Sequence, residues 1–123
     1  MFKTPKDIRE RTFEFAVRII KLCHQLDKRP GVSRNVSRQL LNAGTSVGAH
    51  AEEAQAAQSK PDFISKSSIA LKEARETHYW LRLLIAADIM PEKKLTELRD
   101  EAEELKRILG SIVVSAKRTE QLS

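Results

Sequence analysis

The chain has 123 residues, which is one domain's worth of sequence and is long enough to bury a core without disulfides or a structural metal. Lys and Arg outnumber Asp and Glu by 22 to 17, and only 4 Gly and 4 Pro argue against a turn-rich β sandwich or barrel. No apolar run reaches the ~18 residues of a membrane span, and the single cysteine, Cys23, excludes an internal disulfide and any cysteine-based zinc site.

Prolines divide the chain into four segments without an internal break. Thr4 can cap a helix whose first turn holds Pro5, and later breaks fall at Pro30, Pro61 and Pro91. Apolar residues recur between these breaks with a helical period, and short links make neighbouring helices antiparallel. We therefore predict a single all-α domain over residues 1–123, an up-down-up-down four-helix bundle. The predicted helices are residues 5–27, 33–58, 61–88 and 91–117.

The first segment carries two apolar lines, one through Phe13, Val17 and Ile20 and the other through Phe15 and Ile19. A small bundle needs only a narrow apolar stripe on each helix. The apolar residues that we expect to exceed what one core needs are Phe15, Ile19, Trp80 and Leu83. Two interpretations stay open: a thick core within one chain, or oligomerisation through these faces.

Small residues mark the second segment, with Gly44 and Gly48 four positions apart beside several alanines. Glycine costs a helix up to ~1 kcal/mol relative to alanine and is tolerated where another backbone comes close. We expect this small-residue face to lie against Ala70 and Ala74 of the third segment.

Polar residues in the middle of the chain suggest a structural network rather than a catalytic site. Its predicted members are Glu53, Glu73, Glu76 and Arg75. Inward carboxylates can hold paired metals in bundles, but the Glu-x-x-His spacing that such sites use is absent. There is no nucleophile elbow and no glycine-rich phosphate loop. We expect neither an enzyme nor a cofactor or metal site.

The charge surplus is concentrated near the N-terminus, where residues 1–28 hold seven Lys and Arg against four Asp and Glu. The basic residues predicted to bind nucleic acid or a partner are Arg11, Arg18, Lys21, Lys28, Arg29, Arg34 and Arg38. The alternative is an ordinary solvated face, as in residues 91–117, where acidic and basic residues balance. Most aromatic residues lie on core lines, so phosphate contacts are expected rather than base stacking.

Two sequence blocks carry a family resemblance. The first block contains residues 44–49 (GTSVGA), 53–60 (EAQAAQSK) and 62–66 (DFISK), and the second contains residues 69–77 (IALKEARET) and 79–81 (YWL). Together they resemble the bacterial four helix bundle protein family, which includes the 23S rRNA intervening-sequence proteins. The accessory variability determinant of diversity-generating retroelements is similar more distantly. The resemblance covers about residues 10–115.

The resemblance implies a ring-shaped homopentamer without an assigned enzyme activity. Intervening-sequence members are encoded inside inserts in ribosomal RNA genes, and the retroelement proteins associate with nucleic acid and a reverse transcriptase. The implied partners are further copies of the chain, RNA or DNA, and a reverse transcriptase-like or ribosome-associated protein. Five copies would multiply the formal charge of +5 fivefold, which strengthens any attraction to phosphates.

Two functional hypotheses follow for a basic cytoplasmic protein that does not associate with membranes. The leading hypothesis is a non-enzymatic homo-oligomeric bundle that binds structured RNA, or a nucleoprotein partner, through its basic face. The alternative is a protein-interaction scaffold that presents sites to a partner enzyme without touching nucleic acid.

Overall fold

The computed structural model of this protein describes residues 8–29 and 31–122. They form the helices α1 (Ile8–Leu26), α2 (Val32–Gln55), α3 (Lys60–Ala86) and α4 (Glu92–Leu122). No strand occurs in these two described ranges, so the predicted all-α fold with four helices is confirmed. The predicted helix start at residues 4–7 and the break at Pro30 lie outside the described residues.

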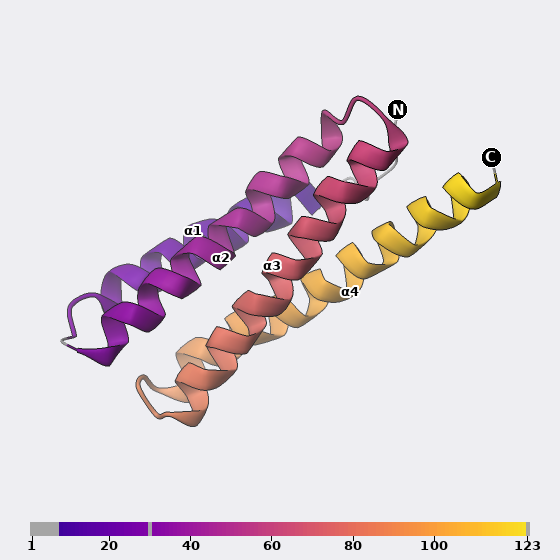
Figure 1. Ribbon diagram of the computed structural model, residues 1–123. Helices are drawn as coiled ribbons and strands as arrows, with labels where there is room; N and C mark the ends of the chain where they lie inside the picture. Colours follow the sequence, from indigo (N-terminus) through magenta and orange to yellow (C-terminus); the bar gives the residue numbers. More distant parts are fainter. Residues whose placement is uncertain (1–7, 30, 123) are drawn as a thin grey trace.

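Consecutive helices are joined by short turns and run in opposite directions (Figure 1). Each helix packs extensively on the next one along the chain, whereas α1 and α4 contact each other less. The α1–α2 turn and the α3–α4 turn lie at the same end of the molecule (Figure 1). The fold therefore has two unequal junctions along α4, a close one with α3 and a looser one with α1.

Local side chains explain where the helices begin and end. Ser59 caps α3 by accepting a hydrogen bond on its side chain from the backbone N–H of Asp62 at 3.1 Å, and Pro61 occupies the first turn. The preceding helix, α2, ends at Gln55 with Ala56 as its C-cap, rather than at the predicted residue 58. Gly31 precedes α2 with φ of 83°, a left-handed conformation that favours glycine. α4 continues to Leu122, five residues beyond the predicted end at residue 117.

The two glycines of α2 face α1, which corrects the expectation that they face Ala70 and Ala74. A Cβ on Gly44 would lie 2.7 Å from Cγ2 of Ile19, and one on Gly48 would lie 3.2 Å from the carbonyl oxygen of Thr12. The spacing therefore marked a close helix–helix approach correctly but assigned it to the wrong partner helix. The reason is that period fixes which residues share a face, while the choice of neighbour is tertiary.

The two apolar lines of α1 have different fates. Phe15 and Ile19 are 1% and 0% exposed and belong to the core, so they are not the surplus that the sequence suggested. Phe13, Val17 and Ile20 are instead 66%, 37% and 50% exposed. We call these three residues the α1 stripe. An exposed apolar line along one side of a helix is typical of a surface that another molecule covers.

Of the two α3 residues predicted to exceed the core, Trp80 and Leu83, only one is exposed. Trp80 is partly buried and packs against the core, and its indole N–H donates to Oε1 of Glu76 at 3.5 Å. Leu83 is exposed, as is Tyr79, whose ring meets that of Trp80 edge to face with centroids 5.3 Å apart. A second, smaller apolar patch therefore lies on the outer side of α3.

Candidate nucleic-acid interface

Two of the predicted binding residues on α1 are engaged within the fold. Arg11 forms ion pairs with Glu101 at 2.6 Å and with Glu104 at 3.3 Å, and Arg18 pairs with Glu97 at 3.3 Å. The hydrogen bond to Glu101 raises the pKa of Arg11 further above its usual value. These pairs connect α1 to α4 at their looser junction. Arg11 therefore has two carboxylate partners within the fold, and its role in binding stays a prediction.

Arg29 also has a structural partner. Its Nη1 donates a hydrogen bond to the carbonyl oxygen of Ile89 at 2.6 Å. Because Arg29 lies in the α1–α2 turn and Ile89 in the α3–α4 turn, this bond ties together the two turns at one end of the molecule. One nitrogen of the guanidinium therefore already donates a hydrogen bond within the fold.

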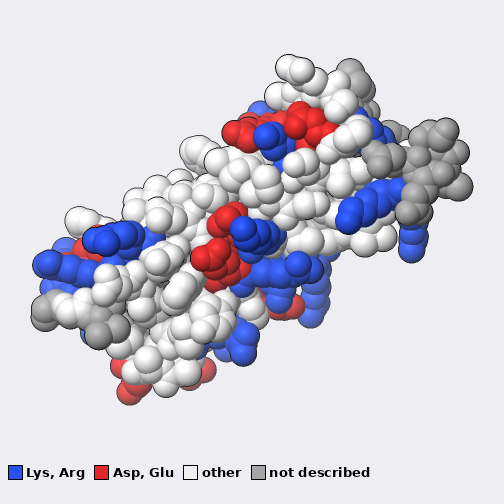
Figure 2. All heavy atoms as spheres, in the orientation of Figure 1, with Lys and Arg blue, Asp and Glu red and all other residues white. Residues whose placement is uncertain are grey.

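The remaining predicted basic residues, Lys21, Lys28, Arg34 and Arg38, are exposed. Arg34 and Arg38 lie one turn apart on α2 and line a surface hollow of about 400 Å³. Asp27, Ser37 and Leu41 complete its lining. We call this feature the basic hollow. Figure 2 shows Lys and Arg side chains gathered at this end of the molecule, where α1 joins α2.

The four residues of the predicted polar network do not make polar contacts with one another within the described part of the chain. Glu53 faces Lys66 of α3, with 3.8 Å between Oε2 and Nζ, and Glu76 accepts from the indole of Trp80. In the described part of the chain, no hydrogen bond or ion pair joins any two of Glu53, Glu73, Glu76 and Arg75. Their helical spacing placed them on related faces, but the four side chains do not share partners.

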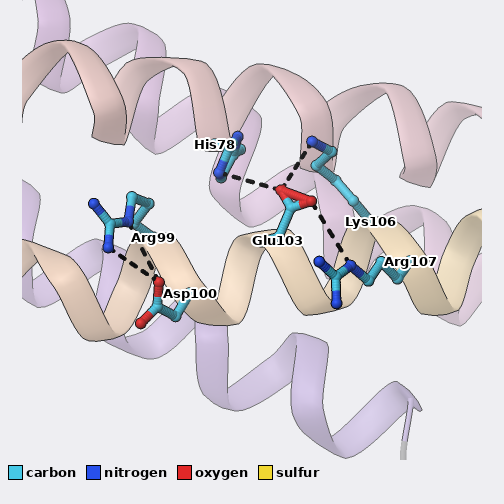
Figure 3. Close-up of polar contacts among 6 residues, drawn as sticks. All are labelled: His78, Arg99, Asp100, Glu103, Lys106 and Arg107. Carbon is cyan, nitrogen blue, oxygen red and sulfur yellow. Dashed lines mark hydrogen bonds and ion pairs between the residues drawn. The ribbon is translucent and has the colours of Figure 1, made fainter.

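A charged cluster that the sequence analysis missed lies where α3 and α4 pack together (Figure 3). His78 of α3 points toward Glu103 of α4, with 3.4 Å between Nε2 and Oε2. Lys106 donates to the same oxygen at 3.1 Å, and Arg107 Nε lies 3.9 Å from Oε1. Beside them Arg99 pairs with Asp100 at 3.3 Å. We call the cluster of His78, Arg82, Arg99, Glu103, Lys106 and Arg107 the α3–α4 seam.

Electrostatics make the seam positive. Burial lowers the pKa of His78, and Lys106 opposes its protonation more strongly than Glu103 favours it; Arg82 and Arg99 lower it further. The hydrogen bond from Lys106 is the main cause that lowers the pKa of Glu103. At neutral pH the seam therefore combines a neutral imidazole, one carboxylate and several permanent cations.

The signal for the seam was present in the sequence as a helical period. Positions 97, 101 and 104 are acidic and share one side of α4, whereas Arg99, Glu103 and Lys106 share another side. The net charge of residues 91–117 looked balanced, because acidic and basic residues occur there in equal numbers. The separation is visible only when the side that faces α1 is distinguished from the side that faces α3.

Metal and membrane sites are not indicated. Within residues 8–29 and 31–122, no three or more His, Cys, Asp or Glu side chains come together in a group that could hold a metal ion. No helix in those ranges combines the length and the apolar character that crossing a bilayer requires. The candidate features are thus the basic hollow, the α3–α4 seam and the α1 stripe.

Comparison with known proteins decides the family. The family profile described as 23S rRNA-intervening sequence protein matches residues 6–111, which is most of the chain. The chain belongs to the 23S rRNA-intervening sequence protein family. This confirms the resemblance inferred from the two sequence blocks.

A solved relative supports the same family assignment and the fold. The chain is similar to a protein of unknown function from the S23 ribosomal protein family of Bacteroides thetaiotaomicron, whose crystal structure superposes with a TM-score of 0.79. The two are 41% identical, and the match covers 86% of this chain and 97% of that one. None of the curated proteins matches this family member.

Proposed function

We propose that the protein is a non-enzymatic homo-oligomer that binds structured RNA through the basic hollow and the lysines beside it. The observation that carries the proposal is the arrangement of Arg34 and Arg38 on one hollow with Lys28 at the same end of the molecule. Among the described residues that line the hollow, Asp27 is the one that is acidic. Clustered cations of this kind attract phosphate backbones without reading base sequence. The family description, which names an insert in 23S rRNA, makes structured RNA the first polyanion to test.

Self-association is supported by the α1 stripe. Phe13 also borders a second surface hollow, which is lined by Arg9, Glu10, Glu14 and Glu52 as well. This hollow is mainly acidic, whereas the basic hollow is mainly cationic, so the two surfaces are complementary in charge. Different surfaces that meet head to tail generate closed rings when the rotation closes. The homopentamer that the family resemblance implies is one such ring.

The RNA arm of the proposal is tested by anisotropy titrations of a labelled structured RNA at about 50 and about 200 mM salt. We expect binding that weakens strongly with salt. Arg34→Gln/Arg38→Gln should bind at least roughly tenfold more weakly, since each lost phosphate contact removes about one from the salt slope. Lys117→Gln/Arg118→Gln is the matched control, because it removes the same charge from exposed positions on α4. A wild type that binds no RNA at the lower salt overturns the proposal.

The assembly arm is tested by light scattering on the wild type and on Phe13→Ser/Ile20→Ser. Each of these side chains is at least half exposed, so the substitutions leave the core of one chain intact. We expect a multiple of 14.0 kDa for the wild type and a shift toward a single chain for the variant. A wild type that remains a single chain at high concentration contradicts this arm.

The scaffold hypothesis keeps one specific observation in its favour. Tyr79 and Leu83 are exposed together on α3, and the side of the molecule shown in Figure 2 has a broad uncharged area over α2 and α3. Such a surface suits a protein partner better than it suits a phosphate backbone. Under this hypothesis Tyr79→Ser/Leu83→Ser disrupts partner binding, while Arg34→Gln/Arg38→Gln has no effect on function.

A further inference from the structure

The α3–α4 seam contains a carboxylate held by cations that outnumber it. Oε2 of Glu103 lies 3.1 Å from Nζ of Lys106 and 3.4 Å from Nε2 of His78. Its other oxygen, Oε1, lies 3.9 Å from Nε of Arg107. Arg82 and Arg99 lie close enough to act on the same imidazole. A second carboxylate, Asp100, pairs with Arg99 at 3.3 Å. One negative charge therefore faces several positive ones at a surface between two helices.

We propose that the α3–α4 seam binds a backbone phosphate of RNA, and that Glu103 occupies the position of this phosphate when RNA is absent. The proposal deepens the proposed RNA binding and rests on it. It adds a second contact region, built from α3 and α4, to the basic hollow on α2. It also assigns Glu103 the role of an internal competitor for the cations of the seam.

The chemistry of the ligands supports the exchange. A phosphodiester and a carboxylate each offer one negative charge and two acceptor oxygens, so Lys106 and Arg107 can donate to either one. The side chain of Glu103 is 35% exposed, and it contacts His78, Lys106 and Arg107, which are all members of the seam. Turning it into water therefore breaks only the contacts that the phosphate replaces.

The hydrogen-bond donors of the seam differ in how far they are exposed. The side chain of His78 is 14% exposed and that of Lys106 is 26% exposed, whereas Arg107 is 79% exposed. The first two are held by packing between α3 and α4, and the third can reach outward. Two largely covered donors beside an exposed guanidinium suit a polymer backbone, which approaches from outside and cannot enter a closed pocket.

The position of the seam makes it separate from the basic hollow. His78 precedes the end of α3 at Ala86 by eight residues, about 12 Å along the helix axis. The basic hollow lies on the first turns of α2, at the end of the molecule where α3 ends (Figure 1). Variants in the seam and in the hollow therefore remove different phosphate contacts, and their effects can be measured independently.

The decisive variant is Lys106→Gln/Arg107→Gln, studied by the same RNA titrations. We expect roughly tenfold weaker binding and a salt slope reduced by about one, as for the loss of one phosphate contact. The control Lys117→Gln/Arg118→Gln carries the same charge change about three turns further along α4 and should alter affinity less than about twofold. An unchanged affinity and slope for Lys106→Gln/Arg107→Gln, with RNA bound normally by the wild type, overturns the seam site alone.

Glu103→Gln tests the competitor role with the opposite sign. Removing the carboxylate should strengthen RNA binding by roughly threefold or more, because the cations no longer exchange one anion for another. Weaker binding by Glu103→Gln, or no change, overturns the competitor role.

A second readout follows the imidazole of His78 by NMR. RNA should shift its ring signals, and a bound phosphate should raise its pKa by stabilising the imidazolium. Inorganic phosphate serves as the probe for a small-anion site. Signals that respond to inorganic phosphate but not to RNA overturn the proposal, since the seam would then hold a free anion instead of a polymer.

Discussion

The two flanks of α4 carry opposite charge and do different work. Toward α1, Glu97, Glu101 and Glu104 neutralise Arg11 and Arg18. Toward α3, the carboxylate of Glu103 contacts Lys106, Arg107 and the imidazole of His78. The helix looks neutral as a whole, yet it removes positive charge from one junction and adds it at the other. The number of charged residues in a segment therefore does not show where a basic surface lies. Ion pairs between helices neutralise some of these charges and leave others unpaired.

The flanks also differ in how they are held together. α4 packs extensively on α3 and less on α1, so the ion pairs of Arg11 and Arg18 supplement a thinner apolar contact. Ion pairs of this kind contribute little when exposed and more when partly buried. The charged residues of the α3–α4 seam, in contrast, lie at a junction that apolar packing already stabilises.

The largest effect should come from the core shared by both flanks. Leu105→Ala removes a side chain that is 0% exposed and should lower the free energy of unfolding by about 3 kcal/mol. Val114→Ala, at an exposed position of the same helix, should change it by less than about 0.5 kcal/mol. Urea denaturation followed by circular dichroism measures both. Similar losses for the two variants would mean that ion pairs, and not the core, hold α4.

Next in size is the effect of reversing the charge at the α1–α4 junction. Arg11→Glu places a carboxylate opposite Glu101 and Glu104 and should lower the free energy of unfolding by about 2 kcal/mol, because the pair is partly buried. Adding Glu101→Arg should recover part of the loss, which a double-mutant cycle in urea quantifies. The absence of any recovery would show that the Arg11 stem, rather than its charge, matters.

A smaller effect distinguishes the flanks by pH. The pKa of His78 is lowered in the folded protein by burial and by Lys106, so the unfolded chain binds more protons below the ordinary histidine value of about 6.5. The contribution of His78 to stability is therefore complete above this pH and is lost as the pH falls. His78→Gln should lose less stability than the wild type between pH 7 and pH 5, as measured by thermal unfolding. Parallel losses would contradict the assignment.

The smallest effect is expected at the exposed end of the α1–α4 junction. Arg18→Gln removes a pair at 3.3 Å whose side chains are 44% and 83% exposed, and it should cost less than about 0.5 kcal/mol. Urea denaturation of the Arg11 and Arg18 variants then shows whether the more buried pair contributes more to the free energy of unfolding. A cost equal to that of losing the Arg11 pair would show that exposure does not set the strength of these contacts.

Much of the fold could be predicted from the sequence, because proline positions and apolar period are local signals. The four helices and the two apolar lines of α1 follow from Pro61, Pro91 and the spacing of Phe13, Val17 and Ile20. Which line enters the core could not be decided, since both are apolar and period does not give the neighbour.

The candidate interface was less predictable, because it depends on which charges meet. Lys21, Lys28, Arg34 and Arg38 remain exposed, in keeping with the predicted basic face, and their role in binding stays a prediction. Arg11, Arg18 and Arg29 are engaged within the fold. The α3–α4 seam escaped prediction because His78 and Glu103 are 25 positions apart and become neighbours only when α3 and α4 pack.

The sequence alone determined the helical segments, the family and the total charge, since these depend on residue order and on local backbone preferences. Only the tertiary structure decided that the glycines of α2 receive α1, that Phe13 stays outside while Phe15 goes inside, and which carboxylate each arginine meets. The physical reason is that the sequence of a helix shows which residues share a side, but not which side a neighbouring helix will cover. Burial and ion pairing are assigned only when a neighbouring helix covers one of them.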